Sequence, residues 1–293
     1  ISVWQNDNRY YCRCADCQKI IDRTDSPMGP WLTLVNEVAD AVAKEHPDVK
    51  VGTLAYQFSR KPPKNLKPRD NVQIQLCSIE ACMLHPINAD NCPQNAAFQK
   101  DLAGWSEITD QIYIWNYNTN FRNYLQPCPN LRSIGPNVKY FASNGAKGVF
   151  MQASYETPVA EFDRLRNYMI SNMIWDPSRD AAALKDEFLR LHFKESAGPI
   201  RQWLELIYDN ARETGLHRLC FGQAEHFGIT PTIVERGQAL FKKAMDQAES
   251  EAVRQRVERA SLTIHRAAME PALLAMRNKG PWNDSLQKTM RQK

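Results

Sequence analysis

The alternation of strand-like and helix-like segments in the first half of the chain is the feature that most limits its fold. Short segments rich in β-branched residues are separated by longer segments whose apolar residues recur every three or four positions. Strands that are joined through helices form parallel sheets. The sequence therefore predicts an α/β fold for this half. Strands are expected over residues 1–5, 49–58, 72–77, 111–115 and 147–151, and helices over 31–45, 95–105, 131–144 and 159–174.

Two arrangements of these five parallel strands are open. They form either an open, doubly wound sheet with helices on both faces or the last five strands of a (β/α)8 TIM-like barrel. The chain starts directly in an apolar stretch, residues 1–4. This start favours the barrel, and we expect the chain to be part of a longer protein.

The second half of the chain is predicted to be helical throughout. Helices are expected over residues 179–192, 198–214, 232–250 and 251–278, with a polar, frayed end over 280–293. We therefore predict a barrel part over residues 1–176 and a C-terminal α-helical bundle over residues 177–293. Two helices have apolar residues at helical spacing: Leu34, Val35, Val38, Ala39 and Val42 in the helix that follows Pro30, and Val253, Val257, Ala260, Ile264 and Ala267 in the last helix.

Composition and motifs exclude several classes of protein. With 293 residues, 43% hydrophobic and 24% charged, the chain has the composition of a globular protein. Its net charge of +4 is too small to argue for a nucleic-acid partner, and no apolar run reaches the roughly 20 residues of a membrane span. The sequence contains no GxSxG, HExxH, P-loop or GxGxxG motif, which argues against serine hydrolases, thermolysin-type proteases, NTPases and dinucleotide enzymes. We expect no cofactor, and the oligomeric state stays open.

Acids, amides and aromatic rings follow the expected strands, where parallel α/β folds place their reactive groups. Amides and carboxylates match sugar hydroxyls, flat rings match the apolar faces of sugars, and paired carboxylates are what glycoside hydrolysis requires. The sequence therefore predicts a carbohydrate partner. The candidate catalytic residues are Glu80 and Asp7, and the candidate substrate-binding residues are Asn6, Asn8, Trp115, Asn116, Tyr117 and Asn120.

Each of these candidates has a structural alternative. Glu80 is either a general acid, kept protonated by partial burial beside apolar neighbours, or a loop glutamate paired with an arginine. Asp7 is either catalytic or a turn cap. Tyr117 either contacts a substrate or belongs to the core. Glu156 is a weaker candidate, because the Thr-Pro pair that follows it suggests a helix start, where an acid is favourable.

Cys12, Cys14 and Cys17 form the stretch of sequence most like a metal site. Three thiolates together with Cys82 or His85 would complete a tetrahedral zinc site, but the usual pattern has two CxxC pairs and here there is one. Disulfides to distant cysteines and free thiols are the alternatives. We therefore expect no bound metal and keep these three cysteines as the candidates for one.

A basic, proline-containing connection spans residues 59–70. It would serve either as a phosphate-binding loop or, as we favour, as a solvated loop stiffened by its prolines. Its basic residues are Arg60, Lys61, Lys64, Lys67 and Arg69.

The order of the motifs along the chain resembles a known bacterial family. The motifs are Gln5-Asn6-Asp7-Asn8, Tyr11 with Cys12, Cys14 and Cys17, residues 51–56 ending in Tyr56, Cys77-Ser78-Ile79-Glu80, residues 113–117 with Thr119-Asn120-Phe121, and Gly148-Val149-Phe150. Over residues 1–176, and more loosely beyond, the chain is similar to the domain-of-unknown-function 4838 family. That family overlaps glycoside hydrolase family 163, whose members are endo-β-N-acetylglucosaminidases acting on complex N-glycans.

The resemblance implies a fold, an activity and a location. It implies a (β/α) barrel with an appended helical domain, and a secreted, periplasmic or cell-surface glycoside hydrolase of carbohydrate metabolism. In enzymes of this type the substrate acetamide often acts as the nucleophile, one carboxyl group orients it, and another protonates the leaving oxygen. We assign these roles to Asp7 and Glu80. The resemblance also adds Tyr56 to the candidate substrate-binding residues.

Two residues depart from the family pattern. Asn116 stands where many relatives have Asp, and Met151 where many have Glu. A lost carboxylate would mean either an altered substrate or a catalytically inactive, carbohydrate-binding barrel. An unrelated α/β transferase is the remaining alternative.

Overall fold

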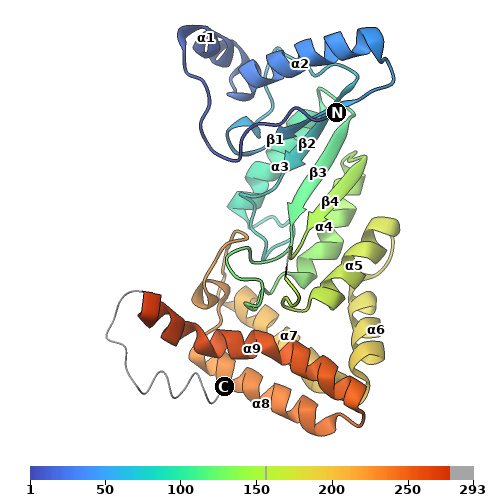
Figure 1. Cartoon of the computed structure of the whole chain (residues 1–293), viewed down its shortest axis with the longest axis vertical. Helices are drawn as coiled ribbons and strands as arrows, with labels where there is room; N and C mark the ends of the chain where they lie inside the picture. Colours follow the sequence, from blue (N-terminus) through green and yellow to red (C-terminus); the bar gives the residue numbers. More distant parts are fainter. Residues whose placement is uncertain (156, 278–293) are drawn as a thin grey trace. The chain divides into compact units, whose positions relative to one another are not determined.

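The computed structural model describes residues 1–155 and 157–277, which divide into two compact units (Figure 1). Unit 1 comprises Ile1–Tyr117 and Pro136–Gln152, and unit 2 comprises Asn118–Gly135 and Ala153–Lys293. The chain thus passes between the units three times. Glu156, the helix end expected at residue 278 and the polar end over residues 280–293 lie outside the described residues.

Unit 1 contains a parallel sheet of four strands in the order β1-β2-β3-β4. These strands match four of the five expected ones, so the α/β class is confirmed. Their bounds are β1 (Val51–Ala55), β2 (Val72–Cys77), β3 (Ile112–Tyr117) and β4 (Gly148–Gln152).

The segment expected as the first strand forms only a single bridge. Ser2 pairs in parallel with Gly52 at the free edge of β1, and the Val3 N–H donates to the Gly52 carbonyl oxygen (2.9 Å). Nearer the end of β1, a side chain takes the place of a backbone contact: the Gln5 amide donates to the Tyr56 carbonyl oxygen (3.0 Å). The prediction of a full strand over residues 1–5 was therefore wrong.

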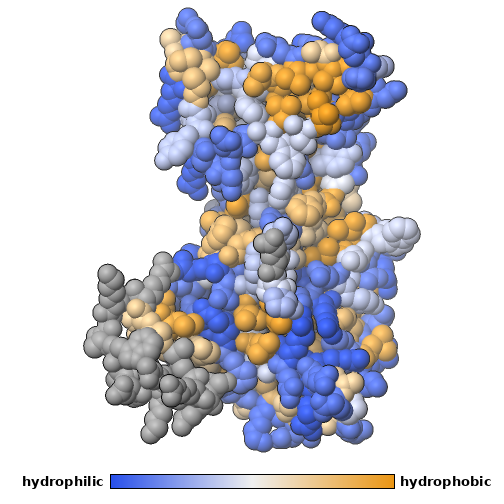
Figure 2. Space-filling model, in the orientation of Figure 1, coloured by the Kyte–Doolittle hydropathy of each residue, from blue (hydrophilic) through white to orange (hydrophobic). Residues whose placement is uncertain are grey.

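The helices of unit 1 are α1 (Ala15–Thr24), α2 (Met28–Glu45), α3 (Pro93–Ser106) and the greater part of α4 (Leu131–Ser143). Helix α1 was not predicted. Leu34, expected on the apolar face of α2, is 46% exposed, and Leu32 is fully buried in its place. Val35 and Ala39 are buried as expected, so the buried face of α2 is rotated toward Leu32 and away from Leu34. Figure 2 shows apolar side chains left at the surface over this helix.

The two faces of the sheet differ in character. One of them, the helix-covered face, is buried: the Trp31 indole N–H of α2 donates to Thr53 Oγ1 on this face (2.9 Å), and Ile74 and Ile114 are fully buried there. The opposite face, here called the aromatic face, has a small buried cluster of Leu54, Tyr56 and Cys77 toward the carboxyl ends of β1 and β2. Its other residues are half-buried or exposed. They are Gln73, Gln75, Tyr113, Trp115, Tyr117, Phe150 and Gln152.

The strand order explains why the helices cover one face. Right-handed crossovers between strands that are consecutive in the sheet put successive helices on the same side. Helices α3 and α4 pack next to each other through Phe98 and Phe141, whose ring centroids are 6.2 Å apart. A doubly wound sheet needs a reversal of strand order, and the four described strands have none. The (β/α)8 barrel is not confirmed, because the described strands form an open sheet.

Unit 2 is helical, as predicted for the second half. Two of its helices pack through the rings of Trp203 and Phe241, whose centroids are 5.8 Å apart. The last helix of the unit buries the apolar residues Val253, Val257, Ile264 and Ala267 on one face. None of the described helices is long and apolar enough to cross a membrane. The domain division near residue 176 stays a prediction. The helices are α5 (Asp163–Trp175), α6 (Ala181–Phe193), α7 (Ala197–Glu213), α8 (Pro231–Gln247) and α9 (Glu251–Arg277).

A buried ion pair lies inside unit 2. Arg166 of α5 and Glu161 are each only 2% exposed, and the guanidinium donates to the Glu161 carboxylate and to Asn130 Oδ1. A buried charge without its partner costs far more free energy than a buried pair, because water no longer compensates it.

We predict that Arg166→Met lowers the free energy of unfolding by about 3–5 kcal/mol, since it leaves the Glu161 carboxylate buried without a counter-charge. The double change Glu161→Gln with Arg166→Met should recover most of this loss. Removing the exposed pair of Arg201 and Asp186 by Arg201→Ala should cost less than about 1 kcal/mol. Urea denaturation measures all three. Equal losses for Arg166→Met and Arg201→Ala would contradict a structural role for the buried pair.

Candidate functional site

A polar network connects the amino-terminal segment to the carboxyl end of β1. Tyr56 directly follows β1, and its hydroxyl donates to Asp7 Oδ1 (2.8 Å). The Tyr56 backbone N–H donates to Ser59 Oγ (3.0 Å), and its carbonyl oxygen accepts from the Gln5 amide (3.0 Å). The Ser59 hydroxyl also donates to the Gln5 side chain. The Tyr56 backbone is therefore held from two sides, and its hydroxyl is bonded to Asp7.

The ionisation of this pair follows from burial. Burial raises the pKa of the Tyr56 phenol above its ordinary range, and the nearby Asp7 carboxylate raises that pKa further. The phenol therefore keeps its proton and donates it to Asp7. Asp7 itself is exposed. The result is a carboxylate that solvent can reach and whose orientation a buried tyrosine fixes.

Glu80 lies in the loop after β2 and is paired with a guanidinium. Arg60 Nη1 is 3.0 Å from Glu80 Oε2, and Arg60 Nε is 2.6 Å from Asp101 Oδ2 of α3. The Arg60 carbonyl oxygen also accepts from the indole N–H of Trp105 (2.8 Å). The contact fits the alternative of a loop glutamate paired with an arginine.

Asp7 and Glu80 nevertheless lie at the same edge of the sheet. Asp7 follows the segment that bridges the free side of β1 and is bonded to Tyr56 at the end of that strand. Glu80 follows β2, which pairs with the other side of β1. In a parallel sheet the carboxyl ends of neighbouring strands share one edge. The structure thus brings the two candidate carboxylates to either side of the end of β1.

The aromatic face presents a group of rings on β3 and β4. Trp115 is stacked with Tyr117 (6.3 Å between centroids) and meets the edges of Phe150 (4.9 Å) and Trp4 (6.1 Å). Its indole N–H donates to Gln152 Oε1 (2.7 Å). Trp4 and Phe150 are both 48% exposed. These two rings and Gln152 were missed as candidates. The strand positions of Phe150 and Gln152 beside Trp115 and Tyr117 would have indicated them, whereas the contact of Trp4 with Trp115 is not one that strand neighbours predict.

Asn116 and Met151 lie on the opposite, helix-covered face. They are register partners on β3 and β4 and are 4% and 8% exposed. The Asn116 amide donates to Ser78 Oγ (2.9 Å). The two residues expected to depart from the family pattern therefore lie beside each other, on the face away from Trp115 and Tyr117.

The remaining amide candidates have structural contacts. Asn8 Oδ1 accepts from the Tyr10 N–H (2.9 Å), and Asn6 is exposed. Asn120 belongs to unit 2 and is fully buried. Its amide donates to the Gly222 carbonyl oxygen (2.8 Å), and its Oδ1 accepts from the N–H groups of Gly222 and Arg122 (each 3.1 Å). Asn120 therefore holds two segments of unit 2 together, and Asn6 is the amide most open to a ligand.

The basic loop forms one wall of a groove beside α3, with a volume of about 1060 Å³. Arg60 and Asp101 are at this groove, together with Lys61 and Lys64. Both lysines pair with Asp25 (2.8 and 3.0 Å), and their hydrogen bonds lower the pKa of Asp25 to about 2. Part of the loop's positive charge is thus compensated within the protein, which fits the stiffened-loop alternative better than a phosphate site.

A family model for a domain of unknown function (DUF4838) matches residues 1–205. The chain belongs to this family. The match confirms the family resemblance seen in the motif order, and it covers all of unit 1 together with helices α5 and α6. No curated protein and no solved structure matches the chain.

The three cysteines of the early motif are brought together in this DUF4838 chain. The Sγ atoms of Cys12, Cys14 and Cys17 lie within 4.8 Å of one another at the amino end of α1, and none of the three forms a disulfide. They form a group that could hold a soft metal ion. Cys82 and His85, expected to complete this group, instead lie together with Cys92.

Hydrogen bonds within this group separate two of its thiols. The backbone N–H of Cys17 and the thiols of Cys12 and Cys17 lower the pKa of Cys14. Its hydrogen bonds to Cys12 and Cys14 raise the pKa of Cys17 to about 12. Cys14 therefore carries the larger share of thiolate near neutral pH.

We predict that iodoacetamide labels Cys14 more than about tenfold faster than Cys17 at neutral pH, because the thiolate is the reacting form. The difference between the two labelling rates should become smaller as the pH approaches about 12, where the Cys17 thiol ionises. Peptide mapping after short exposure measures both rates. In a Cys14→Ser variant, labelling of Cys17 should accelerate, because one cause of its raised pKa is gone. Equal rates in the unmodified chain would contradict the hydrogen-bond pattern.

Proposed function

We propose that this chain contributes the catalytic edge of a glycoside hydrolase that cleaves N-acetylglucosaminide linkages in complex glycans. The observation that carries the proposal is the pairing of the exposed Asp7 with the buried Tyr56, at the same sheet edge as Glu80. An oriented carboxylate and a second carboxyl group at one edge are the minimum set for this chemistry. Complex glycans occur outside cells, so the proposal includes a secreted, periplasmic or cell-surface location.

The proposed reaction uses the acetamide of the substrate as nucleophile. Asp7, held by Tyr56, accepts a hydrogen bond from the acetamide N–H and orients its carbonyl oxygen. That oxygen attacks the anomeric carbon while the glycosidic C–O bond breaks, and Glu80 gives its proton to the leaving oxygen. Water then opens the cyclic intermediate and returns a proton to Glu80. For the first step Glu80 must be protonated, so its pairing with Arg60 has to loosen when substrate binds.

The aromatic face supplies the proposed sugar-binding surface. Trp115, Tyr117 and Phe150 present flat rings next to the amide of Gln152, a combination that suits the apolar faces and the hydroxyls of sugars. We further propose that the sheet is an arc of a (β/α)8 barrel. The unreversed strand order supports this, since all crossover helices of a barrel lie outside it and its reactive groups follow the carboxyl ends of the strands.

A second candidate function is glycan binding without catalysis. The ion pair between Arg60 and Glu80 favours it, because a carboxylate oxygen 3.0 Å from the guanidinium is engaged in a contact within the protein. The aromatic face would serve binding in the same way in both cases. The two functions differ in turnover alone.

We predict that Glu80→Gln lowers kcat on a complex N-glycan or an aryl N-acetylglucosaminide at least about 100-fold, since general acid catalysis contributes that much or more. Asp101→Asn is the matched control, because it removes the other carboxylate of Arg60 and leaves Glu80 in place. Its kcat should stay within a few-fold of the unmodified chain. Normal turnover by Glu80→Gln would remove Glu80 from the mechanism, and glycan binding without any turnover by the unmodified chain would establish the second candidate.

We predict that Trp115→Ala weakens glycan binding by about 1–2 kcal/mol, or roughly 5- to 30-fold in Kd, through loss of ring stacking. Trp175 of unit 2, which is 89% exposed, provides the control Trp175→Ala, with unchanged affinity expected. Isothermal titration with a soluble glycan measures both. Equal affinities for the two variants would contradict the aromatic face as the binding surface.

A further inference from the structure

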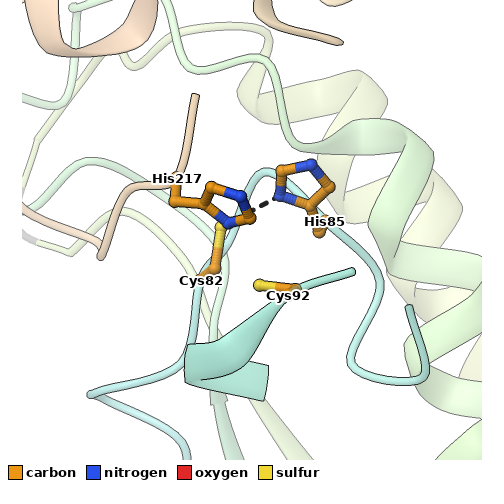
Figure 3. A group of neighbouring side chains, drawn as sticks. All are labelled: Cys82, His85, Cys92 and His217. Carbon is orange, nitrogen blue, oxygen red and sulfur yellow. Dashed lines mark hydrogen bonds between the residues drawn. The ribbon is translucent and has the colours of Figure 1, made fainter. Parts of the chain in front are cut away.

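The loop between β2 and α3 brings three metal-binding side chains together. The donor atoms of Cys82, His85 and Cys92 lie within 4.8 Å of one another (Figure 3). Cys82 Sγ and His85 Nδ1 are 3.3 Å apart. With bonds of about 2.3 Å to sulfur and 2.0 Å to nitrogen, a tetrahedral zinc ion spaces such a pair about 3.5 Å apart. The observed spacing of Cys82 and His85 therefore needs an adjustment of only a few tenths of an ångström to admit the ion.

The chemistry of the three donors selects the class of metal. Two cysteine sulfurs and one imidazole nitrogen suit Zn²⁺, whereas Ca²⁺ and Mg²⁺ require oxygen ligands. Cys82 and Cys92 are each 1% exposed, and His85 is half-buried. Buried thiolates beside a metal are shielded from competing water, and the half-buried histidine leaves a route for the ion to enter.

Asn95 of α3 fixes the positions of two of these donors. Its side chain is fully buried, and its Oδ1 accepts from the Cys82 backbone N–H (2.8 Å). Its amide donates to the carbonyl oxygens of His85 (3.1 Å) and Pro86 (2.9 Å). One side chain therefore spans the turn from Cys82 to His85. Such an outer-shell residue is what holds metal ligands in place before the ion binds.

The rest of the loop is attached to the same helix. Cys92 precedes the first residue of α3, and its carbonyl oxygen accepts from the Ala96 N–H (2.9 Å). Beyond His85, the Ile87 N–H donates to Asn137 Oδ1 of α4 (2.7 Å), and the Ile87 carbonyl oxygen accepts from Gln99 (2.6 Å). The donors are thus placed by α3 and α4, although the loop has no regular secondary structure.

We propose that Cys82, His85 and Cys92 bind a zinc ion, with a fourth position left for water or another ligand. His217, which Figure 3 also labels, is a residue of unit 2 and is not needed for a site with three protein ligands. The ion joins the two ends of the segment from Cys82 to Cys92, and its open fourth position is of the type that accepts water or another small ligand. This site is distinct from the group formed by Cys12, Cys14 and Cys17, and it does not depend on the proposed hydrolase activity.

The test uses the full chain with Cys12, Cys14 and Cys17 all changed to Ser, so that only the proposed site can supply a thiolate cluster. The metal-free protein is titrated with Zn²⁺ under a reductant that carries no thiol, and with Co²⁺ as an optical probe. We expect one equivalent of metal to bind, with a sulfur-to-cobalt charge-transfer band and the visible absorption of tetrahedral cobalt.

Single changes in this background identify the ligands. Cys82→Ser, His85→Ala and Cys92→Ser should each weaken the affinity more than about 100-fold, beyond the 10- to 100-fold loss typical of an outer-shell residue. Cys77→Ser is the matched control, since Cys77 is a buried thiol of the same unit outside the group, and its affinity should match the background. Circular dichroism verifies that each variant is folded.

A second measurement needs no substitution at the site. Removing the metal from the background protein with a chelator should lower Tm, and adding Zn²⁺ back should restore it, because an ion bound only by the folded state stabilises it. Three results would overturn the proposal: no binding by the background protein, a charge-transfer band that survives all three ligand changes, or a disulfide between Cys82 and Cys92 found by differential alkylation of the protein as purified.

Discussion

The helix cover on one face of the parallel sheet is the constraint on which the rest of unit 1 depends. Helix α2 leads into β1, and the right-handed crossovers through α3 and α4 return the chain to the next strand in order, so these helices lie along one side. That side must be apolar, and Ile74 and Ile114 fill it. The other side is released from packing against helices. Strand positions there can hold glutamine and aromatic residues, which a core would accept only with every polar group bonded.

The same architecture places the polar chemistry at the carboxyl edge. The loops that leave β1 and β2 are held by buried polar contacts: Ser59 holds the Tyr56 backbone after β1, and Asn95 holds the Cys82 backbone after β2. Arg60 then links the two loops to helix α3, because it is bonded to Glu80 of the second loop and to Asp101 of α3. Residues with possible chemical roles and residues with structural roles are therefore neighbours in these loops.

Local patterns predicted the elements of the fold, and long-range contacts decided the roles of the side chains. The strands and helices followed from β-branched runs and helical spacing, which depend on neighbouring residues alone. The face of Asn116 could also have been inferred, because it shares the parity of Ile112 and Ile114 along β3. The pairing of Glu80 with Arg60 could not, since it joins two loops.

In the candidate site, too, contacts between residues far apart in the sequence could not be predicted. Asn120 was interpreted as a ligand residue because amides suit sugars, yet its partner Gly222 is 102 positions away in the sequence. The grouping of Cys92 with Cys82 and His85 depends on how the β2–α3 loop folds back, for which no spacing rule exists. Leu34 was misplaced because the apolar residues of α2 cover more than one face, and the sequence does not show which of them, Leu32 or Leu34, packs against the sheet.

The path of the chain through its two units has a practical consequence for anyone who wishes to express them apart. Each unit is assembled from two stretches of backbone, and the stretches alternate. No single truncation point separates the units intact: a stop after Tyr117 removes β4 from the sheet, and a stop after Gln152 leaves an orphaned piece of the helical unit attached. To express unit 1 alone, residue 117 would have to be joined to residue 136 by a designed linker. Unit 2 alone would need a linker from residue 135 to residue 153.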